Sequence, residues 1–428
     1  YASLPEQHRF VIPDGCHWQE VRERTENLGA AIVGAMRQIE IANPDTLYGV
    51  LSMFSSQKWT NKAILNDSKI RDLIEHLSKR KLGNKDYPAD LMGDAYEILL
   101  KKFADDSKAQ AGEFYTPRSV VRLLVHILDP QPGETVYDPA CGSGGMLIEA
   151  IRYMHDDSLC CGSIFGQEKN VVNAAIAKMN LFLHGASDFN VMQGDTLRDP
   201  KILQGGNIAK FDCVIANPPF SLENWGATEW SSDKYKRNIY GTPSDSCGDY
   251  AWIQHMICSM SSGKGRMAVV MPQGILFRGN QEAEIRKQLV ESDLIEAVVT
   301  LGDKLFYGTG LSPCFLIIRR MKQAHHSGRI LMIDGSKILT QKRAQNILEE
   351  NDIDRLYSLY QNYSDEEDYS RIVTLQEIRD KEYNLSPNRY VVYHKEEIRP
   401  YAEVLAEFKQ AYADVKRLEN EFSLLINA

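Results

Sequence analysis

The feature that most constrains the fold is an alternation of short apolar runs with helical segments, which begins near residue 112. The apolar runs are rich in β-branched residues and cover 134–140, 162–168, 189–195, 211–217, 265–272, 296–301 and 314–320. Helical patterns at 144–155, 170–184, 249–262 and 280–291 separate most of them. Strands that alternate with helices form a parallel sheet covered by helices on both faces. We therefore predict a doubly wound α/β domain, with a mostly parallel seven-stranded sheet, over residues 111–345.

The last strands of this series depart from the alternation. The run 314–320 follows its predecessor after a glycine-rich link without a clear helix, so we expect it to run antiparallel. The run 329–336 is expected to add an edge strand. Residues 1–110 show apolar residues at helical spacing and predict an N-terminal helical domain.

The C-terminal segment, residues 346–428, is polar and ends in a predicted long helix over 401–426. Apolar residues repeat along this helix at 4-3-4-3 spacing and then, after a one-residue slip, at its end: Tyr401, Leu405, Phe408, Tyr412, Val415, Leu418, Phe422 and Leu425. Such a stripe packs on the body of its own chain or pairs with a helix of a partner chain. Both alternatives stay open at this point.

Composition excludes several classes of function. The chain is 43% apolar and 25% charged, which is typical of a globular protein, and no apolar run is long enough to predict a membrane span. Its eight cysteines lack CxxC spacing and its histidines lack an HExxH pattern, so we expect reduced cysteines and no metal site. The net charge of −9 disfavours a protein that grips DNA alone, because such binding relies on neutralising phosphates.

Acidic residues end three successive predicted strands, at the edge where open α/β sheets bind ligands. Asp138 ends the first strand, and Gly142 and Gly144 in the following turn let the backbone approach a ligand. Glu168 ends the second strand, where an acidic residue can accept both ribose hydroxyls. Asp195 ends the third and could accept from the exocyclic amine of an adenine. Each acid alone also fits a helix cap or a salt bridge, but together they indicate a cationic, adenosine-containing ligand.

The fourth strand ends in Asn217-Pro218-Pro219-Phe220, where two prolines stop any regular element. The exocyclic amine of a base is a poor nucleophile because its lone pair is delocalised into the ring. The side-chain carbonyl of Asn217 and the backbone carbonyl of Pro218 could each accept one N–H of such an amine, and the prolines fix both acceptors beforehand. Phe220 could stack on a base that has left the duplex. The alternative reading is a plain turn after a buried strand.

In this order, the four motifs resemble the amino-group methyltransferases that use S-adenosylmethionine. The segment GEFYTPRSVVRLLV, residues 112–125, resembles the motif that DNA adenine methyltransferases place ahead of the glycine loop. From about residue 15 to 393 the chain resembles the modification subunit of Type I restriction–modification systems. The segments that carry this resemblance are LMGDAYEILLKKFA, NPPFS, YGTPSDSCGDYAWIQHM, VVMPQGILFRGNQEAEIRKQL and YNLSPNRY. The chain departs at Gly302, where the family usually has proline, and in a looser form of YGTPSDSCGDY.

The resemblance implies a Rossmann-like methyltransferase that moves a methyl group from S-adenosylmethionine to the N6 amine of a flipped-out adenine in duplex DNA. It also implies that Tyr115 and Thr116 line the methionine end of the cofactor. The candidate cofactor-binding residues are Tyr115, Thr116, Asp138, Ala140, Gly142, Ser143, Gly144, Glu168, Asp195 and Thr196. The implied partners are duplex DNA, a specificity subunit and a restriction subunit, and the implied location is the cytoplasm of a bacterium or archaeon.

The stretch 221–248 mixes aromatic and basic residues, which suits contact with a displaced base and nearby phosphates. An ordinary surface loop with a few buried aromatics is the alternative. The candidate DNA-contacting residues are Lys234, Lys236, Arg237, Tyr240 and Arg278, of which Arg278 fits a structural salt bridge equally well. Two other functions stay open: methylation of a protein glutamine or an RNA amine, and a catalytically silent scaffold that binds the cofactor.

Overall fold

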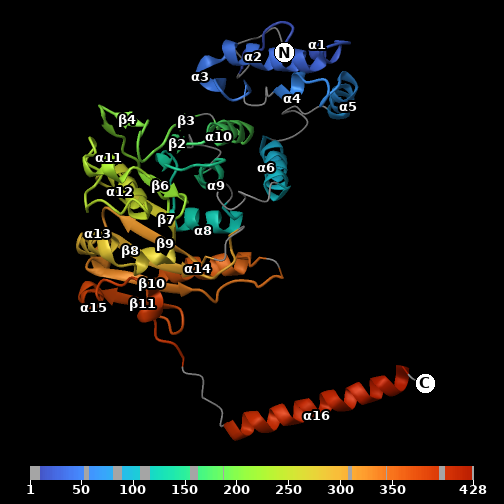
Figure 1. Cartoon of the computed structure of the whole chain (residues 1–428). Helices are drawn as coiled ribbons and strands as arrows, with labels where there is room; N and C mark the ends of the chain where they lie inside the picture. Colours follow the sequence, from blue (N-terminus) through green and yellow to red (C-terminus); the bar gives the residue numbers. More distant parts are fainter. Residues whose placement is uncertain are drawn as a thin grey trace. The chain divides into compact units, whose positions relative to one another are not determined.

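The computed structural model of the chain describes residues 10–52, 57–80, 89–106, 116–154, 162–186, 188–306, 311–343, 345–394 and 401–426. The chain divides into two compact units, Tyr1–Val391 and Val392–Ala428. Figure 1 shows their helices and strands in sequence order. No helix in the described ranges combines the length and the apolar character that a bilayer crossing requires.

The first part of the larger unit is helical, as the sequence predicts. Its helices are α1 (Trp18–Arg22), α2 (Leu28–Ala42), α3 (Pro44–Leu47), α4 (Gln57–Thr60), α5 (Asp67–Ser78) and α6 (Ala89–Asp106). Leu28 of α2 packs with Ile70 and Ile74 of α5 in a small apolar core. The carboxylate of Asp67 accepts the backbone N–H of Leu28 at 3.0 Å, so the two helices are also joined through a helix start.

The rest of the larger unit is built on a nine-stranded sheet, with strand order β11-β10-β8-β9-β7-β6-β1-β2-β3. Its strands are β1 (Val136–Asp138), β2 (Ile164–Glu168), β3 (Phe189–Gln193), β6 (Cys213–Ala216), β7 (Arg266–Pro272), β8 (Ile295–Leu301), β9 (Pro313–Arg319), β10 (Arg329–Gly335) and β11 (Ser370–Thr374). A separate two-stranded hairpin joins β4 (Leu203–Gln204) to β5 (Asn207–Ile208). The prediction of a doubly wound, mostly parallel sheet is confirmed, but β10 and β11 extend the predicted seven strands to nine.

Two details of the sheet bear on the sequence predictions. The antiparallel course expected for 314–320 is confirmed, because β9 pairs antiparallel with both β7 and β8. The expected edge position of β10 is wrong: β10 pairs with β8 on one side and with β11 on the other. Strand β11 lies within the segment 346–428. It is short and only partly buried, so its sequence has too few apolar residues to be recognised as a strand.

Helices cover both faces of the sheet, as Figure 1 shows. They are α8 (Arg118–Leu128), α9 (Gly145–Met154), α10 (Val171–Leu183), α11 (Ala227–Ser231), α12 (Asp249–Ser259), α13 (Asn280–Glu291), α14 (Glu350–Asn362) and α15 (Leu375–Asp380). Alternate residues of β6 divide between two apolar cores: Cys213 and Ile215 join the core of α8, α9 and α14, whereas Val214 and Ala216 join that of α12 and α13. This alternation is the period of two that a strand buried on both faces requires.

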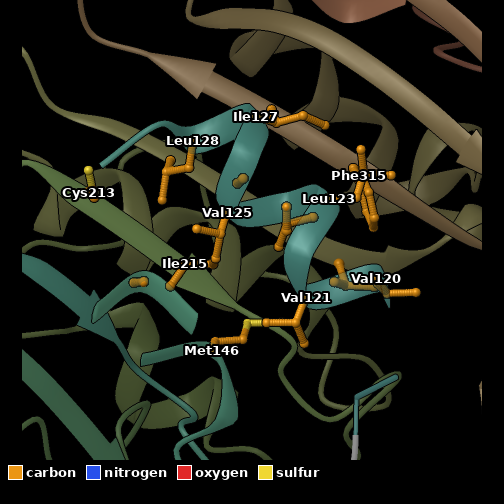
Figure 2. Close-up of a cluster of buried hydrophobic side chains, with 14 of the residues drawn as sticks. Val120, Val121, Leu123, Val125, Ile127, Leu128, Met146, Cys213, Ile215 and Phe315 are labelled. Atoms are coloured by element: carbon orange, nitrogen blue, oxygen red, sulfur yellow. The ribbon is translucent and has the colours of Figure 1, made fainter. Parts of the chain in front are cut away.

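Helix α8 fixes the position of the segment that precedes it. Seven of its eleven residues are buried. In Figure 2, Val125 and Leu128 lie close to Cys213 and Ile215 of β6, and Val121 lies next to Met146 of α9. Since Thr116 stands two residues before α8, this packing also fixes the position of Thr116.

The smaller unit contains α16 (Tyr401–Ile426), so the long helix predicted over 401–426 is confirmed. Several residues of its apolar stripe are exposed within this unit. Tyr401, Phe408 and Phe422 are 79%, 66% and 65% exposed. Among the described residues of this unit, no second helix packs against the stripe.

Candidate active site

The candidate site lies where four neighbouring parallel strands end. Strands β6, β1, β2 and β3 are adjacent and parallel, so their carboxyl ends meet at one edge of the sheet. Asp138 and Glu168 are the last residues of β1 and β2, and Asn217 directly follows β6. The sequence prediction that these side chains share one edge is therefore confirmed, and this is the edge at which such sheets bind ligands.

The turn after β1 is held by hydrogen bonds from the neighbouring strands. Gly142 and Gly144 adopt positive φ angles of 53° and 84°, which residues with a Cβ rarely adopt. The N–H of Gly142 donates to the Glu168 carboxylate at 3.0 Å, and the Thr196 hydroxyl donates to the carbonyl of Pro139 at 2.6 Å. Thr196 is buried and hydrogen-bonds to the backbone of the loop. This role differs from the direct cofactor contact that was predicted for it.

A cavity opens between this glycine loop, the start of α8 and the end of β6. Its lining includes Thr116, Asp138, Ala140, Gly142 and Ser143 among the predicted cofactor-binding residues, together with Asn217. Gly144, Glu168, Asp195 and Thr196 do not line it, and Tyr115 lies outside the described residues.

The sequence predictions missed several charged and polar residues that line the cavity. The additional lining residues include Glu97, Arg118, Glu149, Arg152 and Asn180. Arg118 follows the Tyr-Thr-Pro sequence and could have been selected from that position. The other four lie within helices whose charged and polar residues look like ordinary surface positions. Asn180 is almost fully buried and its amide donates to the carbonyl of Ser143 at 3.1 Å, so it supports the glycine loop.

Two carboxyl groups give the site a preference for positive charge. Asp138 is 2% exposed, and its pKa is raised to about 8, mainly by burial and to a lesser extent by the nearby carboxyl of Glu168, while the N–H of Ala140 opposes the shift. Burial also raises the pKa of Glu168. A cation bound beside these groups would favour their ionised forms. Asp195 is more exposed and pairs with Lys169 at 2.8 Å.

Asn217 shows one atom in use and one atom without a partner. Its amide nitrogen donates to the Thr116 hydroxyl at 2.8 Å. Its carbonyl oxygen is buried and has no hydrogen-bond partner among the described residues. A buried acceptor without a partner costs about 1–3 kcal/mol, so the arrangement is suited to a ligand that donates a hydrogen bond. Phe220 is half-buried, and its ring centroid lies 6.3 Å from that of Phe306.

Comparison with known proteins identifies the family. The family model described as N-6 DNA Methylase matches residues 87–398, which is most of the chain. The chain belongs to this family. The methylase is 35% identical to the methylase subunit of the Type I restriction enzyme MjaVII of Methanocaldococcus jannaschii, over 94% of this chain and 70% of that relative. It is 31% identical to the HindI methylase subunit of Haemophilus influenzae, over 89% of this chain and 84% of the relative.

A solved structure gives the same answer for the fold. The Type I restriction–modification methyltransferase subunit of Streptococcus thermophilus is 28% identical to the methylase, with a TM-score of 0.79 over 91% of this chain and 83% of that one. The match extends over nearly the whole length, in agreement with the resemblance seen in the sequence. Membership of this family favours the DNA methyltransferase reading over a protein-glutamine or RNA amino-methyltransferase.

The structure corrects one of the predicted DNA contacts of the methylase. Lys234 and Lys236 are exposed and Tyr240 is half-buried, so all three can reach a ligand. Arg237 is only 1% exposed. Its guanidinium pairs with Asp233 at 2.8 Å and donates to the carbonyls of residues 196 and 197. The prediction that Arg237 contacts DNA is wrong, because this side chain holds the aromatic stretch onto the loop after β3.

Arg278 forms the structural salt bridge that the sequence left open. It pairs with Asp249, and with Glu282 at 2.6 Å. Cys247, Asp249 and Glu282 lie close enough together to hold a metal ion, but the guanidinium already supplies the positive charge of the cluster. The Asp249 carboxylate also accepts the N–H of Ser221 at 2.7 Å. Ser221 directly follows Phe220, so the cluster fixes the backbone at the end of the Asn-Pro-Pro-Phe segment.

Proposed function

We propose that this chain is the modification subunit of a Type I restriction–modification complex and methylates the N6 amine of an adenine flipped out of duplex DNA. The observation that carries the proposal is the carbonyl of Asn217, buried without a partner at the carboxyl end of β6. An N6 amine carries two N–H donors, and this acceptor is suited to receive one of them. Family membership supplies the substrate class.

The donor site is the edge formed by β1, β2 and β3, and we assign S-adenosylmethionine to it. When bound, this cofactor supplies an electrophilic methyl group on a sulfonium. The residues fit it: the buried carboxyl of Asp138 and the half-buried carboxyl of Glu168 favour a cation, and Gly142 of the positive-φ turn lines the cavity. As in the sequence prediction, we assign Glu168 to the ribose hydroxyls and Asp195 to the adenine amine.

The acceptor half of the reaction is performed by Asn217 and the residues that follow it. The carbonyls of Asn217 and Pro218 accept the two N–H groups of the target amine, which draws the nitrogen toward tetrahedral geometry and frees its lone pair. The two prolines hold these acceptors before the substrate arrives, so little ordering remains to be done during the reaction. Phe220 stacks on the face of the flipped base.

Partner chains supply what this chain lacks. Its net charge of −9 gives it little sequence-independent affinity for DNA, so most phosphate contacts and the reading of the target sequence fall to a specificity subunit. The exposed apolar stripe of α16 is the surface we assign to that subunit. A restriction subunit joins the complete complex. Lys234 and Lys236 add local contacts to the backbone of the DNA.

Product analysis tests this function. The chain, alone and with a co-purified partner chain, is incubated with labelled S-adenosylmethionine and plasmid DNA from a host that lacks the system. The DNA is then digested to nucleosides. We expect N6-methyladenine, and only in the presence of the partner. Label in protein or RNA, or equal DNA methylation without a partner, would contradict the proposal.

A further inference from the structure

We propose that Thr116 is a positioning residue that holds the Asn217 amide in place through one hydrogen bond and thereby keeps its carbonyl available to the target amine. The inference rests on the proposed function and goes beyond it, because the sequence motif that contains Thr116 points only to the cofactor. The structure assigns its hydroxyl to a different partner, the amide nitrogen of Asn217, at 2.8 Å.

An asparagine amide needs such a partner, because its two ends have opposite hydrogen-bonding properties and nearly the same shape. A rotation of about 180° around the last side-chain bond exchanges the carbonyl oxygen with the NH2 group. If the NH2 group faced the target amine, donors would face donors and no hydrogen bond could form. Methyl transfer therefore requires one of the two orientations of Asn217.

In the structure, Thr116 holds the amide with its NH2 group toward the hydroxyl and its carbonyl away from it. A hydroxyl can also donate, so the N–H of the substrate completes the choice between the two orientations. With the carbonyl toward the substrate, the NH2 group points into the protein and needs an acceptor there, since a buried donor without one is costly. The Thr116 hydroxyl oxygen is that acceptor. The carbonyl is then left buried and without a partner among the described residues, ready for the N–H of the substrate. The two observations together describe an amide satisfied on one side and open on the other.

The position of Thr116 is itself well fixed. It lies two residues before α8, whose side chains pack on β6, the strand that carries Asn217 at its end (Figure 2). The hydrogen bond joins residues that are 101 positions apart in the sequence. One packed helix therefore couples the segment ahead of the glycine loop to the catalytic motif.

The substitution Thr116→Val tests the role, because valine keeps the shape of threonine and removes the acceptor. In the complex with its partner chain, at saturating S-adenosylmethionine, we expect the single-turnover rate of DNA methylation to fall about tenfold, which is the scale of one hydrogen bond in a buried site. The affinity for S-adenosylmethionine, measured by calorimetry, should stay within about twofold of wild type, because the hydroxyl acts on Asn217. Thr116→Ser keeps the hydroxyl and should restore most of the rate.

Two results would overturn the inference. One is weakened S-adenosylmethionine binding with an unchanged saturated rate, which would show that the hydroxyl serves the cofactor. The other is a Thr116→Val enzyme with the wild-type rate. If valine lowers the melting temperature, Thr116→Ala with the same serine control takes its place. An active Asn217→Ala enzyme would instead refute the proposed function, so the two failures are distinguishable.

Discussion

Raising the pH from 6 to 8 should tighten the binding of S-adenosylmethionine, because Asp138 is protonated in the free protein at the lower pH. Burial of Asp138, together with the neighbouring Glu168 carboxyl, raises its pKa to about 8. A cationic ligand favours the ionised carboxylate, so binding below pH 8 must release a proton. The free protein should itself lose stability as the pH rises from about 4 to 8, because the native state retains a proton that the unfolded chain has lost.

The size of the effect follows from the ionised fraction of Asp138. With a pKa of about 8, roughly 1% of the carboxyl groups are ionised at pH 6 and about half at pH 8. If binding requires the ionised form, the affinity should rise roughly 50-fold over these two pH units. Because a single proton is released, the affinity can rise at most about tenfold per pH unit.

Calorimetric titration at pH 6, 7 and 8, in buffers of different ionisation enthalpy, measures both the affinity and the proton release. Asp138→Asn is the control, because an amide does not titrate in this range. The α-amino group of the ligand has a pKa of about 8, and the variant shows how much of the pH dependence comes from that group. The variant should bind weakly and lack the rise. Equal affinity of the wild-type protein at pH 6 and pH 8, or a full rise in the variant, would refute the reasoning.

Other predictions concern the neighbouring residues and the C-terminal helix. Arg237→Ala should lower the free energy of unfolding by about 3–5 kcal/mol in chemical denaturation, because it leaves the Asp233 carboxylate unpaired in the interior; an unchanged midpoint would contradict this. Lys236→Ala, the exposed control, should leave the free energy of unfolding unchanged. For DNA binding by the complex, it should lower the magnitude of the slope of log K against log salt concentration by about 1, which corresponds to one lost phosphate contact. Deletion of 401–428 should leave a folded protein that binds S-adenosylmethionine but does not co-elute with its specificity subunit in size-exclusion chromatography; co-elution would rule out this surface.

The strand tips could be predicted from sequence because each signal is local. Glycines after Asp138 and prolines after Asn217 interrupt apolar runs at the positions where the strands end, and parallel order then brings these ends to one edge. The order of the motifs was enough to place the site. The length of the sheet was harder to predict, because β11 is a short, partly exposed strand with weak apolar alternation.

Burial that depends on distant contacts could not be predicted. Lys236 and Arg237 are adjacent basic residues. Lys236 is exposed, whereas Arg237 is buried and donates hydrogen bonds to the carbonyls of residues 196 and 197. Asp233 stands four residues before Arg237, and this spacing was the only local sign of an ion pair. The hydrogen bond from Asn217 to Thr116 likewise joins segments whose proximity is set by the packing of α8.

The most direct test of the catalytic role of Asn217 is the single-turnover rate of methyl transfer to DNA by Asn217→Ala, with calorimetry of S-adenosylmethionine binding on the same protein. We propose that the amide contacts the target amine, and its removal takes away the buried acceptor that has no partner among the described residues. We predict loss of methyl transfer with cofactor affinity near that of wild type. A variant that keeps more than about a tenth of the wild-type rate, a loss of roughly 1.4 kcal/mol or less in transition-state stabilisation, would contradict the account.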